Sequence, residues 1–290
     1  MKINAELPVS GTPTLGELLQ TQTFDDLKKS AAEAVRKRPA GPRERWLLFQ
    51  LLCVDGEWQR ALTQLQTWAG LEPEGQARAQ LYRGLIQSEM FRVEVFAGLR
   101  TPGFVDPAPM WLDTLLRSNE QFAKGDIAGS DALREAALND APATRGDGDQ
   151  TGEFEWLTDS DTRLGPVCEM AVAAGYRWVP FDQMRSLVLT PVATLTDIVW
   201  RSATAILRNG TVLRGYVPVR YPGSEHGPIE SKLARETTWR NVGSTGVIAT
   251  GQKTWATDRG DFGLLEIDAC RFVHDDPPAD RSSEPPIDQP

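Results

Sequence analysis

The 290-residue sequence is poor in the residues that build metal and redox sites. It contains two histidines, His226 and His274, and this number excludes a histidine-rich metal site. The three cysteines are far apart and form no C-x-x-C pair, so we expect small buried apolar side chains at Cys53, Cys168 and Cys270. The sequence therefore predicts no bound metal.

Long apolar runs and an excess of positive charge are also missing. No apolar run approaches the roughly 20 residues that span a bilayer, and the opening MKINAELPVSGTP lacks the apolar core of a secretory signal. The formal net charge is -9, whereas binding to nucleic acid depends on clustered lysine and arginine. We therefore expect a cytoplasmic protein that binds neither nucleic acid nor membrane.

Motifs for catalysis and cofactor binding are absent as well. There is no G-x-x-x-x-G-K-[ST] phosphate loop and no G-x-G-x-x-G fingerprint after a strand. Ser224 and His226 stand almost side by side, but a catalytic triad brings side chains together from separate parts of a fold. No G-x-S-x-G motif surrounds Ser224. We expect a protein that is not an enzyme and has no cofactor, with a hydrolase using Ser224, His226 and a carboxylate as an alternative.

What the sequence does contain is a repeat with a period of 34 residues. Residues 24–39 align with 58–73 at this offset, and the prolines that end both segments obey it too. A third copy, 125–142, ends 69 residues after the second, which is two periods plus one. This period is typical of tetratricopeptide repeats. Residues 1–142 are therefore predicted to form a tetratricopeptide-like α–α superhelix.

Each repeat is predicted to be a helix, a short turn and a second helix. In the second helices the apolar residues recur three and four positions apart, as in 58–68. The preceding helices match too, since Leu15 aligns with Phe49 at the same offset. Gly56 suits the tight turn between paired helices.

Stacked helix pairs form a concave surface that can receive a helix or an extended peptide of a partner. Polar side chains on the first helices of the pairs would line this surface. The candidate partner-binding residues are Arg45, Gln50, Gln80 and Arg83. The alternative for these four is an ordinary solvated helix surface.

The second part of the chain is predicted to be an α+β domain. Residues 143–153 are rich in turn formers and are predicted to be a linker, and residues 154–273 form the domain. Side-chain oxygens in 159–162 are expected to cap a helix over 164–174. The acidic, proline-rich tail, 274–290, is predicted to be disordered.

Beyond Pro180 the apolar periodicity falls to near two, which predicts antiparallel strands. Asn209-Gly210 is expected to form a type I′ hairpin turn between two strands in 203–219. Further strands are predicted over 185–190 and 262–273, with a weaker candidate over 247–257. The expected fold class is thus α+β in two parts, possessing a helical first part and a strand-rich second part.

Several blocks of sequence together resemble the ImpE family, also called TagJ, of type VI secretion accessory proteins. The blocks are RERWLLFQLLCVDGEWQRALTQLQ (43–66), AQLYRGLIQSEMFRVEVFAG (79–98), FEWLTDSDTRLGP (154–166), YRWVPF (176–181), VPVRYPGSE (217–225) and LLEIDACRF (264–272). The resemblance covers roughly residues 43–273.

The resemblance implies a non-enzymatic cytoplasmic protein with a tetratricopeptide-like first domain. It implies binding to the small subunit of the contractile sheath (TssB), through the N-terminal helix of that subunit, and a link to sheath recycling by the ClpV ATPase. The family offers no catalytic residues to transfer. A general peptide-binding adaptor or chaperone unrelated to the sheath is the alternative.

Overall fold

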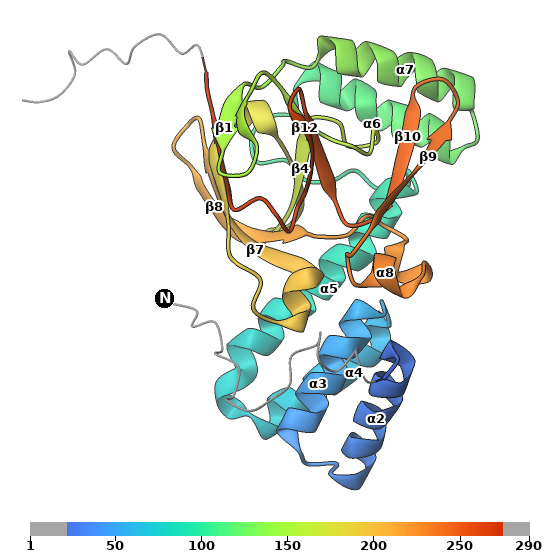
Figure 1. Ribbon diagram of the computed structural model, residues 1–290, viewed down its shortest axis with the longest axis vertical. Coiled ribbons are helices and arrows are strands. Elements are labelled where there is room, and N and C mark those ends of the chain that lie inside the picture. The colour runs from blue at the N-terminus through green and yellow to red at the C-terminus, as the bar shows by residue number, and fades with distance from the viewer. Residues whose placement is uncertain (1–21, 275–290) are drawn as a thin grey trace, which may run out of the picture.

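The computed structural model describes residues 22–274 and divides them into a helical part and a strand-rich part (Figure 1). The helices are α2 (Phe24–Lys37), α3 (Pro42–Val54), α4 (Trp58–Leu71), α5 (Gln76–Phe96), α6 (Met110–Ala123), α7 (Ile127–Asp140) and the short α8 (Ile229–Lys232). The predicted two-part α+β fold class is confirmed. The helix predicted around Leu15 and the tail beyond His274 lie outside the described residues. Within the described range, no helix is both long and apolar enough to cross a membrane.

The turn between paired helices occurs twice with the same backbone geometry. After α3, Gly56 has φ 73° and the next amide, that of Glu57, donates to the carbonyl of Leu52 at 2.9 Å. After α6, Gly125 has φ 83° and the next amide, that of Asp126, donates to a carbonyl of α6 at 3.0 Å. The repeat seen in the sequence thus corresponds to two equivalent helical hairpins, α3–α4 and α6–α7.

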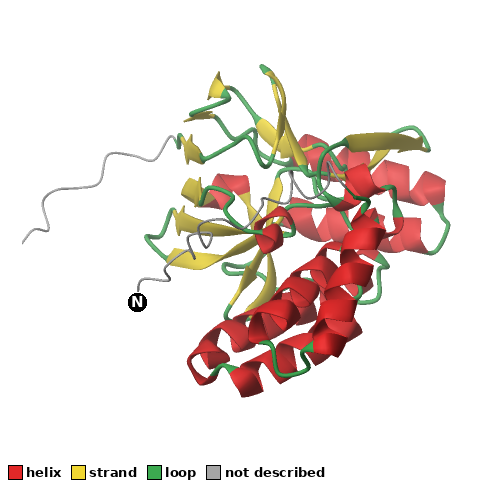
Figure 2. Ribbon diagram, turned by 60° about the horizontal axis from the view of Figure 1, so that its bottom comes forward, coloured by secondary structure: helices red, strands yellow, loops and turns green. Residues whose placement is uncertain are grey.

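The two hairpins pack in different places. The hairpin α3–α4 shares a core with α2 and the first half of α5, whereas α6 and α7 share theirs with residues of the strands such as Tyr176 and Trp178. The long helix α5 runs between the two hairpins (Figure 1). Figure 2 shows the helices gathered on one side of the strands. The third copy of the repeat is therefore built onto the sheet.

The strands form an antiparallel sheet of eight, in the order β2-β1-β13-β6-β7-β8-β4-β5. Their bounds are β1 (Gly146–Gly148), β2 (Gly152–Phe154), β4 (Val167–Val172), β5 (Gly175–Pro180), β6 (Met184–Leu189), β7 (Trp200–Leu207), β8 (Val212–Pro218) and β13 (Ala269–Phe272). Two smaller sheets stand beside it: β3 (Leu157–Asp159) with β11 (Thr254–Thr257) and β12 (Gly260–Gly263), and β9 (Thr237–Val242) with β10 (Gly246–Gly251). The segment predicted to be a linker, 143–153, contains β1 and the start of β2.

The helix predicted over 164–174 is wrong. Residues 167–172 form β4, which is buried almost throughout. A strand covered on both faces has a continuous apolar run, and periodicity cannot separate such a run from a buried helix. Asp161 does not cap a helix; its carboxylate accepts from the backbone amide of Arg163 at 3.0 Å and closes a local turn.

The hairpin predicted in 203–219 is confirmed as β7 and β8, but its turn is not type I′. Gly210 has φ 85°, whereas Asn209 is absent from the non-glycine residues with positive φ, of which Ala234 stands alone in the described range. The amide of Gly210 donates to Leu207 at 2.9 Å, and the amide of Leu207 to Thr211 at 2.9 Å. This is a type I turn with a glycine bulge, a longer loop than the type I′ turn allows.

The other strand predictions are confirmed in part. The strand over 185–190 corresponds to β6. The segment 262–273 contains the end of β12 and all of β13, which belong to different sheets. The weaker candidate, 247–257, is likewise divided between β10 and β11 at Gly251, whose φ is 94°.

Gly56 provides a test of how the two parts fit together. A Cβ at this position would meet Cβ and Cγ of Glu225 at 2.5 and 2.6 Å, whereas one at Gly125 would meet nothing within 4 Å. Positive φ alone costs an alanine about 1–2 kcal/mol. Gly125→Ala should lose about that much stability, and Gly56→Ala about 1 kcal/mol more by urea denaturation, because of the added clash. Equal losses would contradict the contact between Gly56 and Glu225.

Candidate functional site

The four candidate partner-binding residues lie in two pairs on α3 and α5. Arg45 on α3 donates to a backbone carbonyl of the α2–α3 turn and to a glutamine of α4, both at 2.8 Å, and Gln50 keeps 9% of its surface exposed. On α5, Arg83 donates to the exposed Gln80 at 2.7 Å. Gln80 is therefore the most accessible of the four, Arg45 and Arg83 are half-buried, and Gln50 is held within the helix packing.

The helical and strand-rich parts meet at the C-terminal end of α3, where Arg220 is buried. Its guanidinium donates to the carbonyls of Val54 at 2.5 Å and Cys53 at 3.3 Å. These carbonyls close the helix and have no partner inside it. Asp55 follows directly and accepts from Lys232 of α8 at 2.6 Å. Burial lowers the pKa of Arg220 below its usual value. Arg220 thus adds a side-chain cap to the backbone hydrogen bonds that close α3 at Gly56 and Glu57.

A buried ionic network fills the space between α5 and the sheet. Arg92 on α5 forms two hydrogen bonds to Glu169 on β4, at 2.5 and 2.8 Å. Lys253 lies 2.5 Å from the same carboxylate and 3.0 Å from Asp159. All four side chains are at most 2% exposed. Two cations and two carboxylates therefore satisfy one another without solvent.

Burial acts on the two carboxylates with opposite outcomes. It would raise the pKa of Glu169, but Arg92 and Lys253 outweigh it and hold that pKa at about 2. Burial does raise the pKa of Asp159, to about 6, although Lys253 opposes the change. Glu169 faces two cations and Asp159 shares one of them. Glu169 is therefore ionised at neutral pH, while Asp159 titrates just below neutrality.

Ser224 and His226 lie in very different surroundings on the 3₁₀ turn η4 (Ser224–His226). Ser224 is fully buried; its hydroxyl donates to the carbonyl of Tyr221 at 2.6 Å and accepts from the amide of Gly251 at 2.8 Å. The side chain of His226 is 84% exposed. No hydrogen bond joins Ser224 to His226 in the described part of the chain. The geometry therefore gives the hydrolase alternative no support.

The predicted burial of the cysteines is confirmed. Cys53, Cys168 and Cys270 are free thiols with at most 1% exposure. Between residues 22 and 274, no group of three or more His, Cys, Asp or Glu side chains is placed to hold a metal ion.

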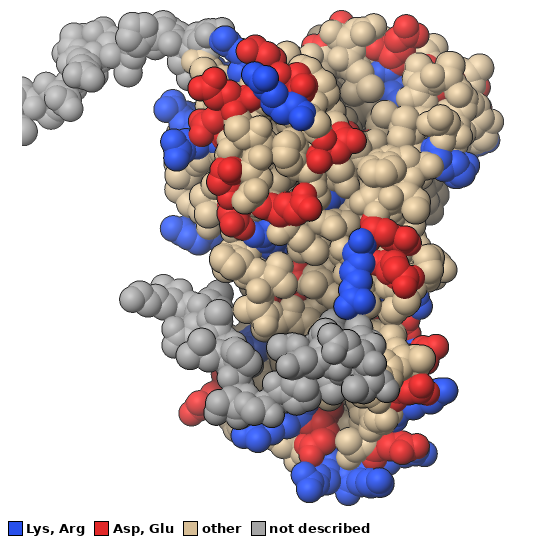
Figure 3. Space-filling model, viewed as in Figure 1, with Lys and Arg blue, Asp and Glu red and all other residues tan. Residues whose placement is uncertain are grey.

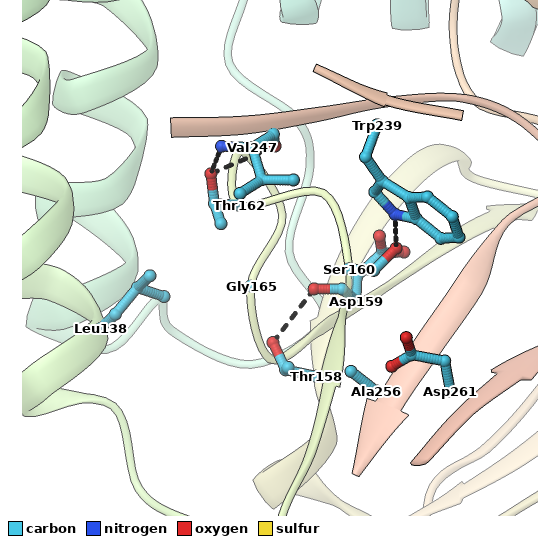
Figure 4. Close-up of a pocket in the computed structure, with 10 residues that line it drawn as sticks. All are labelled: Leu138, Thr158, Asp159, Ser160, Thr162, Gly165, Trp239, Val247, Ala256 and Asp261. Carbon is cyan, nitrogen blue, oxygen red and sulfur yellow. Dashed lines mark hydrogen bonds between the residues drawn. The ribbon is translucent and has the colours of Figure 1, made fainter. Parts of the chain in front are cut away.

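A pocket of about 370 Å³ opens where the two small sheets face α7 (Figure 4). Its floor is a row of three cross-strand partners on β3, β11 and β12: Thr158, Ala256 and Asp261. Its walls come from Trp239 on β9 and Val247 on β10, and Leu138 on α7 lies at the far end (Figure 4).

A chain of hydrogen bonds connects this pocket to the buried network. The indole nitrogen of Trp239 donates to the hydroxyl of Ser160 at 2.9 Å, and Ser160 lies 3.0 Å from the hydroxyl of Tyr221. Tyr221 in turn donates to Asp159 at 2.7 Å, the carboxylate that pairs with Lys253. These hydrogen bonds fix the orientation of the Trp239 indole, although 48% of the residue's surface is exposed.

Sequence reasoning missed both the network and the pocket. The signal for the network was present, since Glu169 interrupts the apolar run VCEMAV and Arg92 stands in the run MFRVEVF. A charge inside a buried element requires a partner. Which partner it finds depends on pairing between distant strands. Trp239 gave no signal because TTWRN shows no apolar alternation.

Comparisons with known proteins give a consistent result. The family model described as ImpE protein matches residues 151–271. The type VI secretion system accessory component TagJ of Pseudomonas aeruginosa is 38% identical over 259 residues, which cover 88% of this chain and 90% of that protein. A crystal structure of a Vibrio parahaemolyticus protein superposes with a TM-score of 0.80 at 22% identity, covering 89% of this chain and 97% of the other. At this low identity, the likeness to the Vibrio parahaemolyticus protein shows a shared fold.

Proposed function

The chain belongs to the ImpE/TagJ family of type VI secretion accessory proteins, and from this membership we propose that it is a non-enzymatic adaptor that binds the small sheath subunit, TssB. The bound element is the N-terminal helix of that subunit. Binding links the sheath to its recycling by the ClpV ATPase in the cytoplasm. The observation that carries the proposal is the 38% identity over 88% of the chain to a type VI secretion accessory component.

The helical part supports a contact with a helix. Its hairpin α3–α4 packs with α2 and the first half of α5. Together with the 34-residue period, this packing supports a tetratricopeptide-like arrangement, a class of fold that receives helices and extended peptides. On α5 within this part, Gln80 is exposed and accepts a hydrogen bond from the half-buried Arg83. We place the contact with the sheath helix on the surface around these two residues.

The test is a binding measurement between this protein and the small sheath subunit encoded in the same genome. By calorimetry, the intact subunit should bind, and a subunit lacking its N-terminal helix should not. Arg83→Glu should weaken binding by about tenfold, or about 1.4 kcal/mol, because it reverses one charge at the interface.

Arg271→Glu is the matched control, since it makes the same charge change on the strand-rich part, where Arg271 is 78% exposed. It should leave the affinity unchanged. Equal binding of the intact and shortened subunits, or binding of neither, would refute the proposed partner. Equal effects of the two arginine variants would move the contact away from α5.

A further inference from the structure

The pocket beside Trp239 combines an aromatic wall, an apolar interior and one carboxylate without a partner. Asp261 on β12 is exposed, lines the pocket, and its carboxylate makes no hydrogen bond or ion pair with any residue in 22–274 (Figure 4). The other acidic side chain at the pocket, Asp159, is already paired with Lys253 and Tyr221. Asp261 is therefore the charge that remains available to a ligand.

The hairpin β9–β10 has one covered edge and one open edge. On the β10 side, Thr162 donates its amide to Val247 at 3.0 Å, and the amide of Ala249 donates to Asp161 at 3.1 Å. On the β9 side, no further strand pairs within the described residues, and the four central residues of β9 are exposed. An exposed strand edge is a template for an added strand.

The lining of the pocket is acidic, since it contains Asp159 and Asp261 and no lysine or arginine. Figure 3 shows lysine and arginine at the far end of the helical part, near the α2–α3 turn, and side chains of both charges over the strand-rich part of the same face. The basic residues of that turn include Arg36, Lys37, Arg38 and Arg43, all exposed. A cationic ligand is therefore favoured by the carboxylates of the pocket's own lining.

We infer that β9 and the pocket form a docking site for an extended segment of a partner protein that carries an arginine. The segment adds as a strand to the open edge of β9. Alternate side chains then face the side of the sheet that carries Trp239. The arginine enters the pocket, its guanidinium stacks on the indole and forms a bidentate pair with Asp261, and its aliphatic stem contacts Val247 and Ala256.

The fixed indole makes this site suitable for recognition. Trp239 is held by Ser160 and Tyr221 before any ligand arrives, so little side-chain freedom is lost on binding. The volume of about 370 Å³ lies in the range of small-ligand pockets, about 300–1,000 Å³. This site is separate from the proposed sheath contact on α5, so either proposal can fail without the other.

The probes are blocked tripeptides, acetyl-Val-Arg-Val-amide and its citrulline analogue, which has the same shape without the charge. The readout is the indole N–H signal of Trp239 in the full-length protein by NMR, assigned with Trp239→Phe. The arginine peptide should shift this signal saturably, and the citrulline peptide should bind about tenfold more weakly, because the charged pair with Asp261 is lost.

Asp261→Asn provides the complementary variant, since its exposed side chain has no contact whose loss would affect folding. It should reduce the advantage of arginine over citrulline to about twofold or less. A peptide N-methylated at both valines should lose binding, because it cannot pair with β9. Equal binding of arginine and citrulline peptides, an advantage unchanged in Asp261→Asn, or full binding of the N-methylated peptide would each overturn the proposal.

Discussion

Glu169→Gln should lower the free energy of unfolding by about 3–5 kcal/mol, the largest effect we expect from a single substitution. The substitution keeps the shape of the side chain but removes the charge that faces both Arg92 and Lys253. Two buried cations would then share Asp159 and Glu89 as their remaining acidic neighbours. Equilibrium denaturation in urea at pH 7 measures the loss.

Glu94→Gln is the matched control for this substitution. Glu94 also forms an ion pair, with Arg100 at 3.1 Å, but its side chain is 47% exposed. Removing this charge should lower the free energy of unfolding by no more than about 0.5 kcal/mol. Adding Lys253→Met to Glu169→Gln should restore part of the stability, because it removes one of the unpaired cations. Similar losses for Glu169→Gln and Glu94→Gln would show that water reaches the network.

Asp159→Asn should change how stability depends on pH. The pKa of Asp159 is raised by burial from 3.8 to about 6 in the folded protein. The stability that this group contributes is therefore fully present below about pH 4 and is lost as the pH rises through about 6. Between these pH values the free energy of unfolding of the wild type should fall by about 3 kcal/mol relative to that of the variant. Each pKa unit corresponds to about 1.4 kcal/mol.

Urea denaturation of both proteins at several pH values between 4 and 7 measures this difference. Glu169 contributes in the opposite sense, because its lowered pKa of about 2 gives stability that is lost only as the pH falls from about 4 toward 2. The chosen window therefore avoids most of the Glu169 contribution, and the comparison with Asp159→Asn removes the groups that both proteins share. Curves for wild type and Asp159→Asn that run parallel from pH 4 to pH 7 would contradict the raised pKa.

The parts of the fold that sequence could predict are those fixed by neighbouring residues. Helix α4 followed from apolar spacing, and the β7–β8 hairpin followed from Asn209-Gly210. The 34-residue period located the two turns at Gly56 and Gly125. In each case, the residues that form the sequence pattern are the same ones that pack in the helix or form the turn.

The parts that sequence could not predict depend on distant pairing. The run around β4 was mistaken for a helix because both of its faces are covered, by residues far away in the chain. Asp261, Ala256 and Thr158 form one row only because β12, β11 and β3 pair in a particular register. No local pattern encodes that register, so the pocket was invisible before the structure was known.

The position of Arg220 bears on how the protein can be divided. Arg220 belongs to the stretch 151–271 that matches the family model, but the carbonyls it caps, on Cys53 and Val54, lie outside that stretch. A fragment limited to 151–271 would keep the guanidinium and lose its acceptors, and a helical fragment would lose the guanidinium that these carbonyls accept from. The stretch that the family model matches is therefore smaller than the unit of cooperative folding, and neither half should be an autonomous module.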